Sequence, residues 1–175
     1  MKKKILIGFT VLVITSIAFF AKSQTSGTID FLTISQFDLT RTGTSPSTNT
    51  ILLGESDFLQ KFGSAATTST EYAEEDDSNM THYSYNGADV WYENDELIAI
   101  NITSPNFAFE MSNGTVIKVG DNIASVSNIF PTSWSNKQFS NQVFVGLNDQ
   151  IGVVDANLIF EFDTNTNLIT EITVQ

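Results

Sequence analysis

The chain has 175 residues, of which 20 are acidic, eight are basic and none is cysteine. Without cysteine there is no disulfide, no thiol nucleophile, no thiolate metal site and no lipid attached to an N-terminal cysteine. The excess of acids repels phosphate groups, which disfavours nucleic acids and anionic lipid surfaces as partners.

The first 23 residues are organised like a secretory signal peptide. Residues 2–4 are lysines, residues 5–21 are mostly apolar, and Ala21 and Ser23 are the small residues expected before a cleavage at Gln24. An uncleaved anchor helix is the alternative, but the apolar run is shorter than the ~20 residues of a membrane span. We therefore expect a secreted or periplasmic protein without a membrane anchor. Residues 24–175 keep four cations against 20 acids, a formal charge of −16.

Alternation with period two predicts strands in the first half of this mature chain. Residues 31–37 alternate, with Phe31 and Phe37 on the same face. Asn86-Gly87 between two aromatic runs predicts a tight hairpin. Residues 97–103 follow as a third strand of the same meander. The predicted linkers of this half are residues 41–50 and residues 64–81.

The stretch ILLGESDFLQKFG, residues 51–63, predicts a short helix. The helix begins at Glu55 or Ser56, and Gly63 is suited to the position that follows its last turn. Its apolar stripe consists of Phe58, Leu59 and Phe62. A helix of two turns is unstable alone, so this stripe must pack on a sheet.

The stretch VIKVGDNIASVSNIFP, residues 116–131, predicts a second short helix. Asp121 is the expected cap, and Pro131 is expected to end the helix. Ile123, Val126, Ile129 and Phe130 recur at helical spacing. The strands expected around this helix are residues 107–111, closed by a turn at Asn113-Gly114, and residues 142–147, 158–162 and 168–174, with a turn at residues 163–167.

The same order of elements therefore occurs twice: strand, Gly followed by an acid, short helix, three-stranded meander. Phe62 corresponds to Phe130, and Ile100 and Ile102 correspond to Ile172 and Val174. These correspondences predict an α+β fold of two tandem β-α-β-β-β units, with short helices packed on antiparallel sheet. The first unit covers residues 24–104 with its leading strand and linker, and the second covers residues 105–175.

A tandem unit of this kind resembles the superfamily of the β-lactamase inhibitor protein. Its single-unit relatives include the small lipoprotein of the outer-membrane barrel-assembly machinery. The resemblance lies in Leu53-Gly54-Glu55 with Phe62-Gly63, and in Val119-Gly120-Asp121 with Phe130-Pro131, each followed by a meander. It covers residues 51–174 and implies binding to another protein, in an inhibitor-like role. It carries over no inhibitory residue.

Metal sites are not expected. Glu74-Glu75-Asp76-Asp77 lacks the fixed spacing and the glycine of a calcium loop. Residues 163–167 have alternating oxygen side chains but lack that glycine, and Val174 stands where the last ligand, a glutamate, belongs. A hairpin turn explains these residues without a cation. Whether either acidic loop binds calcium stays open, and the single imidazole, His82, leaves no two-histidine zinc site.

Catalysis is not expected either, and no cofactor is implied. A serine nucleophile would need His82, the only histidine, as its base, and no Gly-x-Ser-x-Gly motif is present. With 20 acids a carboxylate pair could arise by chance. Glu93 and Glu161 occupy similar places in the two meanders, but nothing marks them as such a pair.

The aromatic residues are the candidate binding residues. They are Tyr83, Tyr85, Trp91 and Tyr92 on the first meander, and Trp134 in the segment PTSWSN. Tyrosine and tryptophan are favoured anchors of protein interfaces and also stack on sugars. Trp91 and Tyr92 point to opposite faces of a strand, so one of them should lie at a surface.

These observations favour a secreted, non-catalytic protein that binds another protein through an acidic sheet surface with aromatic anchors. A basic partner suits the charge, and association should weaken with salt. The alternatives are a carbohydrate-binding module that uses Trp134 or the Tyr83–Tyr92 hairpin, and a hydrolase with a carboxylate pair. The sequence leaves the identity of the partner and the oligomeric state open.

Overall fold

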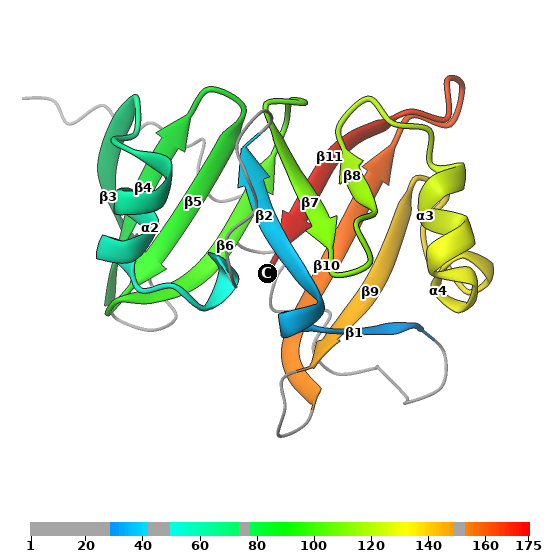
Figure 1. Ribbon diagram of the computed structural model, residues 1–175, viewed down its shortest axis with the longest axis horizontal. Coiled ribbons are helices and arrows are strands. Elements are labelled where there is room, and N and C mark those ends of the chain that lie inside the picture. The colour runs from blue at the N-terminus through cyan, green and yellow to red at the C-terminus, as the bar shows by residue number, and fades with distance from the viewer. Residues whose placement is uncertain (1–28, 42–49, 74–77, 149–152) are drawn as a thin grey trace, which may run out of the picture.

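The computed structural model describes residues 29–41, 50–73, 78–148 and 153–175. Most of it is an eight-stranded sheet with the order β1-β9-β10-β11-β6-β5-β4-β3 (Figure 1). Its strands are β1 (Phe31–Thr33), β3 (Thr67–Ala73), β4 (Ser78–Tyr85), β5 (Ala88–Glu93), β6 (Glu96–Ile102), β9 (Gln142–Asn148), β10 (Val153–Phe162) and β11 (Ile169–Val174). Neighbouring strands are antiparallel, except that β1 runs parallel to β9.

A second, three-stranded antiparallel sheet lies in front of the middle of the large sheet (Figure 1). Its order is β2 (Phe37–Arg41), β7 (Phe107–Met111) and β8 (Val116–Lys118). The helical elements are the 3-10 helices η1 (Ile34–Gln36) and η2 (Thr50–Leu52) and the α-helices α2 (Glu55–Phe62), α3 (Ala124–Ile129) and α4 (Pro131–Ser135). Nothing in the described part of the chain is a helix long and apolar enough to cross a membrane. The predicted signal peptide, residues 1–23, lies outside that part.

The predicted α+β fold of two β-α-β-β-β units is wrong, because the protein is a β-rich fold with few short helices. The strand before each helix does not join the sheet of its own meander: β8 precedes α3 but belongs to the small sheet. The segment 31–37 is not one strand, because η1 divides it into β1 and β2, which enter different sheets. Residues 67–73, expected in a linker, form β3. The acidic run 74–77 lies outside the described residues.

The first predicted helix is confirmed as α2. It begins at Glu55, buries Phe58 and Phe62, and ends before Gly63, whose φ of 78° favours glycine. Gly54 has no side chain to cap it. Instead Asp95, from the turn between β5 and β6, accepts a hydrogen bond from the Glu55 N–H at 2.7 Å. This contact ties the start of α2 to the large sheet.

The second predicted helix differs from expectation at both ends. Asp121 does not cap it, because its Oδ2 accepts the Lys118 N–H at 3.0 Å. The Asn122 Oδ1 accepts the Ala124 N–H instead. Pro131 does not end the helical segment but begins α4, at the first position, where a missing N–H costs nothing.

The tight turns are confirmed. Gly87 and Gly114 have positive φ between paired strands, as the two Asn-Gly sequences predict. In the turn before β11, Asp163 Oδ1 accepts the N–H groups of Thr166 and Asn165, which holds the pKa of that carboxyl below its usual value. The turn at Gly87 fixes the register of the hairpin β4–β5, in which His82 lies opposite Trp91.

The hydrophobic core lies against one face of the large sheet. Figure 1 shows α2, the small sheet, and α3 with α4 side by side along this face. Phe58 of α2 is fully buried and meets Tyr92 of β5 edge to face at 5.7 Å, while Phe130 stacks on Phe160 of β10. The other face is covered by none of these elements, and it provides the candidate site.

The centre of the large sheet joins β6 to β11. Asn101 lies opposite Thr173, and the flanking pairs are Ile100 with Val174 and Ile102 with Ile172. This antiparallel pairing joins the two segments that the predicted repeat relates to each other. Strands also cross the predicted boundary at residue 104, since β1 pairs with β9 and β2 pairs with β7.

Candidate functional site on the outer sheet face

The outer face is the side of the large sheet that points away from the helices and the small sheet. In β4 the buried Tyr83 and Tyr85 point into the core, so His82, which directly precedes Tyr83, points to the opposite, outer face. In β5 the buried Val90 and Tyr92 leave Asp89 and Trp91 on the outer face.

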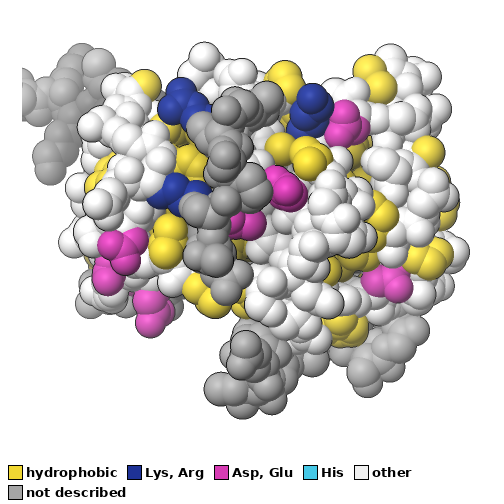
Figure 2. All heavy atoms as spheres, viewed as in Figure 1, with side chains coloured by type: hydrophobic (Ala, Val, Ile, Leu, Met, Phe, Trp, Pro, Cys, Tyr) yellow, Lys and Arg dark blue, Asp and Glu magenta, His cyan; other side chains and the backbone are white. Residues whose placement is uncertain are grey.

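The outer face is acidic because no strand of the large sheet contains Lys or Arg. The cations of the described residues lie elsewhere: Arg41 in β2, Lys61 in α2, Lys118 in β8 and Lys137 after α4. Figure 2, which views the covered side, shows Lys and Arg side chains among the acids there. Among the described residues, Lys and Arg are therefore confined to the covered side, while acids lie on both sides of the large sheet.

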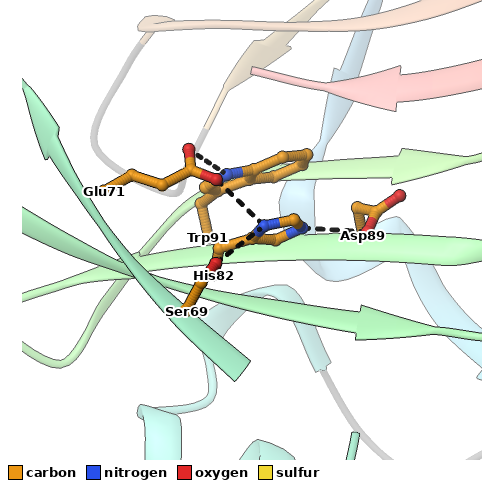
Figure 3. Close-up of polar contacts among 5 residues, drawn as sticks. All are labelled: Ser69, Glu71, His82, Asp89 and Trp91. Atoms are coloured by element: carbon orange, nitrogen blue, oxygen red, sulfur yellow. Dashed lines mark hydrogen bonds and ion pairs between the residues drawn. The ribbon is translucent and has the colours of Figure 1, made fainter. Parts of the chain in front are cut away.

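His82 is the centre of a polar cluster on β3, β4 and β5 (Figure 3). Its Nδ1 lies 3.0 Å from Glu71 Oε1, and its Nε2 lies 2.9 Å from Asp89 Oδ1. An imidazolium can donate to both carboxylates at once. The ring stacks on the Trp91 indole, with centroids 4.5 Å apart and planes 6° apart.

Trp91 is fixed on the outer face by this cluster. Its Nε1–H donates to Glu71 Oε2 at 3.2 Å, and one side of its ring rests on His82. The side chain is partly exposed. A ring held in one orientation loses little conformational freedom when a partner packs on it, which favours a role as an anchor.

The cluster contains the serine, histidine and acid of a serine nucleophile site, but the hydrogen bonds among them differ from those that such a site needs. Ser69 Oγ lies 3.4 Å from His82 Nδ1, at the limit of a hydrogen bond, while Glu71 is closer to the same nitrogen. A general base needs a nitrogen that is available to the hydroxyl. Both ring nitrogens here face carboxylates.

A second acidic feature lies on β10 and β11, where Glu161 and Glu171 are directly opposite each other. Glu161 accepts hydrogen bonds from Asn141 and Gln142, and Glu171 accepts one from Thr173. Neither has a Lys or Arg ion-pair partner among the described residues. Burial, with the charge of Glu161, raises the pKa of the Glu171 carboxyl.

Apolar side chains complete the outer face near β1 and β9. Phe31 lies over Gly146, where an added Cβ would come within 2.5 Å of the Phe31 ring. Phe144 of β9 packs against Phe139, with ring centroids 6.0 Å apart. Ile159 of β10 lies on the same face and is 8% exposed.

Three of the five candidate aromatic residues lie in the core. Tyr83 donates to Glu55, Tyr85 donates to the Gly63 carbonyl and Tyr92 donates to the Leu53 carbonyl. Burial and the hydrogen bond to Glu55 raise the pKa of Tyr83 to about 12, and burial raises those of Tyr85 and Tyr92. These hydroxyls hold α2 and the residues beside it onto the sheet.

Trp134 lies in α4, on the covered side, away from the cluster around Trp91. Its ring packs on Phe162 with centroids 5.7 Å apart, and the Lys137 ammonium lies 4.1 Å from the centroid of the same ring. Both contacts occupy ring surface. Of the five candidates, only Trp91 is therefore joined to the acids of the outer face.

Sequence reasoning missed Ser69, Glu71 and Asp89 as neighbours of His82. Asp89 could have been found, because it is two residues before Trp91 on β5 and its side chain therefore points to the same face. Ser69 and Glu71 carry no such signal, since the mostly polar sequence of β3, TTSTEYA, is typical of a linker. Glu171 was missed as the partner of Glu161, because the pairing of β10 with β11 depends on the register shift at Phe162.

Comparison with known proteins gives little. The chain matches no protein-family model and no curated protein. Among solved structures it has a likeness to an extracellular protein containing a SCP domain from Bacillus anthracis str. Ames, at a TM-score of 0.38 and 7% identity. The likeness covers 78% of this chain and 49% of that one, so this chain spans about half the length of that structure. A likeness this weak carries no argument about fold or function.

Proposed function

We propose that the protein is a secreted or periplasmic, non-catalytic binding protein whose outer sheet face binds a basic protein partner. The observation that carries this proposal is the composition of the large sheet, which contains no Lys or Arg. It instead presents Glu71 and Asp89 in the cluster with the partly exposed Trp91, and Glu161 with Glu171 farther along the sheet on β10 and β11. An acidic face with an aromatic anchor suits a partner surface rich in Lys and Arg.

Localisation is part of the same proposal and rests on the signal-like residues 1–23. An inhibitor-like role, which the resemblance to the β-lactamase inhibitor protein superfamily implies, also belongs to it. Such a role would need only a rigid surface, and the large sheet with its buried face is one. Rigid interfaces pay a smaller ordering cost on binding than flexible ones.

The geometry disfavours the two alternatives. A sugar site on the Tyr83–Tyr92 hairpin would need exposed tyrosine rings, and these tyrosines are buried. Trp134 already has Lys137 over its ring. A hydrolase would need acids or a serine with a base in a recessed site. His82 is instead bracketed by two carboxylates on a sheet face.

The test is affinity capture with the mature chain, residues 24–175, from native extracellular and envelope fractions, with elution by rising salt and identification by mass spectrometry. We expect basic proteins that elute by about 0.5 M NaCl, because salt screens contacts between exposed charges. Trp91→Ala should weaken their binding about 30-fold, the effect of losing a hot spot of about 2 kcal/mol.

The matched control is Val116→Ser, which changes an exposed apolar side chain of β8 on the covered side. It should leave capture unchanged. Capture that is the same for wild type and Trp91→Ala, or that is lost in Val116→Ser, would refute the outer face as the binding surface. Binding of a glycan that is insensitive to salt would favour the carbohydrate alternative.

A further inference from the structure

The strand β3 ends the large sheet on one side. Among the described residues it pairs with β4 alone, through seven consecutive pairs from Thr67 with Ser84 to Ala73 with Ser78, and without a register shift. The opposite end of the sheet differs, because β1 has only three residues. A regular edge strand directs alternate N–H and C=O groups away from its neighbour, so β3 offers a template for one more strand.

The strand also lacks the features that usually prevent such pairing. Proteins protect sheet edges with proline, lysine, bulges or charged side chains that point inward. The sequence of β3, TTSTEYA, contains no proline and no lysine, and its pairing with β4 contains no bulge. The side chains of residues 67–70 are exposed. Threonine and serine there neither block an incoming backbone nor repel it by charge.

We propose that the outer edge of β3 binds an extended segment of the partner protein by strand addition, with Lys or Arg at alternate positions of that segment. The proposal rests on the proposed function and deepens it by naming the form of the partner. Backbone hydrogen bonds to β3 would supply affinity, and the alternate basic side chains would supply specificity.

The acids of the outer face favour Lys or Arg at the alternate positions of the added segment that point to this face. The side chains of an added strand alternate between the two faces of the sheet, and those on the outer face would lie beside Ser69 and Glu71. Glu71 and Asp89 share one imidazole between them, so this corner of the sheet keeps a net negative charge even when His82 is protonated. A Lys or Arg beside Glu71 meets no other Lys or Arg there, because no strand of the large sheet contains one.

A second copy of the chain is a poorer occupant of the edge. Each mature chain has a formal charge of −16, and an added β3 would bring Thr, Ser and Glu, without any cation, to the same corner. Like charges on two associating surfaces raise the free energy of the complex. The charge therefore favours a basic segment from another protein.

The experiment uses the mature chain and the synthetic seven-residue peptide acetyl-KTKTKTK-amide, matched in length to β3. Binding is measured by fluorescence anisotropy, and the site by amide hydrogen exchange. We expect slower exchange in residues 67–71 on binding. The same peptide with every backbone nitrogen methylated keeps its charge but cannot donate to β3, and should bind about 100-fold more weakly after the loss of some three hydrogen bonds.

Two variants with equal charge locate the site. Thr67→Lys/Ser69→Lys places cations at the outer-face positions of β3 and should reduce binding of the unmodified peptide about tenfold or more. Thr164→Lys/Asn165→Lys makes the same change of charge in the exposed turn before β11 and should cost less than about threefold, because that turn is distant along the sheet. The exchange pattern of each unbound variant verifies that β3 still pairs with β4.

The results separate this proposal from the proposed function. Equal affinity of the two peptides, or protection confined to other strands, would overturn strand addition while leaving a basic partner on the outer face possible. A dimer of the wild type that dissociates in Thr67→Lys/Ser69→Lys would also overturn it, in favour of a second copy. Absence of binding to any basic peptide, together with failed salt-dependent capture, would overturn both.

Discussion

The hairpin β4–β5 sets the register that places His82 opposite Trp91, and its turn residue Gly87 gives the sharpest test of that geometry. Gly87 has a φ of 97°, and a Cβ added there would lie 1.7 Å from Ser104 Oγ and 2.6 Å from Ser104 Cβ. The hydroxyl can rotate, but the Ser104 Cβ cannot move without its backbone. Gly87→Ala should therefore reduce the free energy of unfolding through backbone strain of about 1–2 kcal/mol and a steric cost of about 1–3 kcal/mol.

Urea unfolding, followed by circular dichroism, measures the two contributions separately. Gly114→Ala is the matched control for strain alone, because its φ is 82° and nothing lies within 4 Å of the added Cβ. The double variant Gly87→Ala/Ser104→Gly should recover the steric part and destabilise about as much as Gly114→Ala. If Gly87→Ala costs no more than Gly114→Ala, or if Ser104→Gly recovers nothing, the turn geometry is wrong.

Three further predictions concern the core, the cap of α2 and the acid pair. Phe58→Ala should cost about 3–5 kcal/mol in urea unfolding, because the fully buried ring leaves a cavity between α2 and the sheet; a loss below about 1 kcal/mol would contradict the docking of α2. Asp95→Ala should cost about 1 kcal/mol by removing the acceptor of the Glu55 N–H, and Asp57→Ala, an exposed control in the same helix, should cost less in the same assay. The pKa of Glu171 is raised in the folded state, so the unfolded chain releases this proton at a lower pH than the folded chain does. The free energy of unfolding therefore falls as the pH rises from the ordinary pKa of glutamate to the raised pKa. Glu171→Gln should flatten this fall and stabilise the protein at neutral pH by about 0.5 kcal/mol, and a decrease there would show that the like-charge contact with Glu161 is misassigned.

Local chemistry explains which parts of the fold the sequence predicts. The Asn-Gly turns, the start of α2 at Glu55 and its end at Gly63 depend on residues close in the chain, and all of these are confirmed. The parity of Ala88, Val90 and Tyr92 also places Trp91 on the opposite face of β5. These features are determined by backbone preferences and by alternation, which a single sequence displays.

The rest of the fold depends on pairings between distant segments. Thr67–Ala73 has the composition of a linker and becomes a strand because β4 supplies its hydrogen bonds. The segment 31–37 divides between two sheets because Gln36 Oε1 accepts the Thr33 N–H in η1, which turns the chain. Asp121 could have capped α3, but the Lys118 N–H is its partner. Several such local alternatives have similar energies, and tertiary contacts decide among them.

In the candidate site, too, some features follow from the local sequence and others from the pairing of distant segments. Trp91 was among the residues proposed from composition, while its neighbours Glu71 and Asp89 reach it through the pairing of β3, β4 and β5. Tyr83, Tyr85 and Tyr92 have the composition of interface residues but serve the core, where each hydroxyl has an acceptor. Amphipathic aromatic residues suit either role, so burial has to be known before a role is assigned.

Hydroxyl-radical footprinting of the mature chain, with and without the captured basic proteins, tests the use of the outer face most directly. The method reports the solvent exposure of individual side chains, and the two sides of the large sheet carry reactive residues. We predict that Met80, Trp91 and Phe144 on the outer face become less reactive in the complex, while Leu52 and Val116 on the covered side keep their reactivity. Protection of Leu52 and Val116 with unchanged reactivity at Trp91 would contradict the assignment of the outer sheet face as the binding surface.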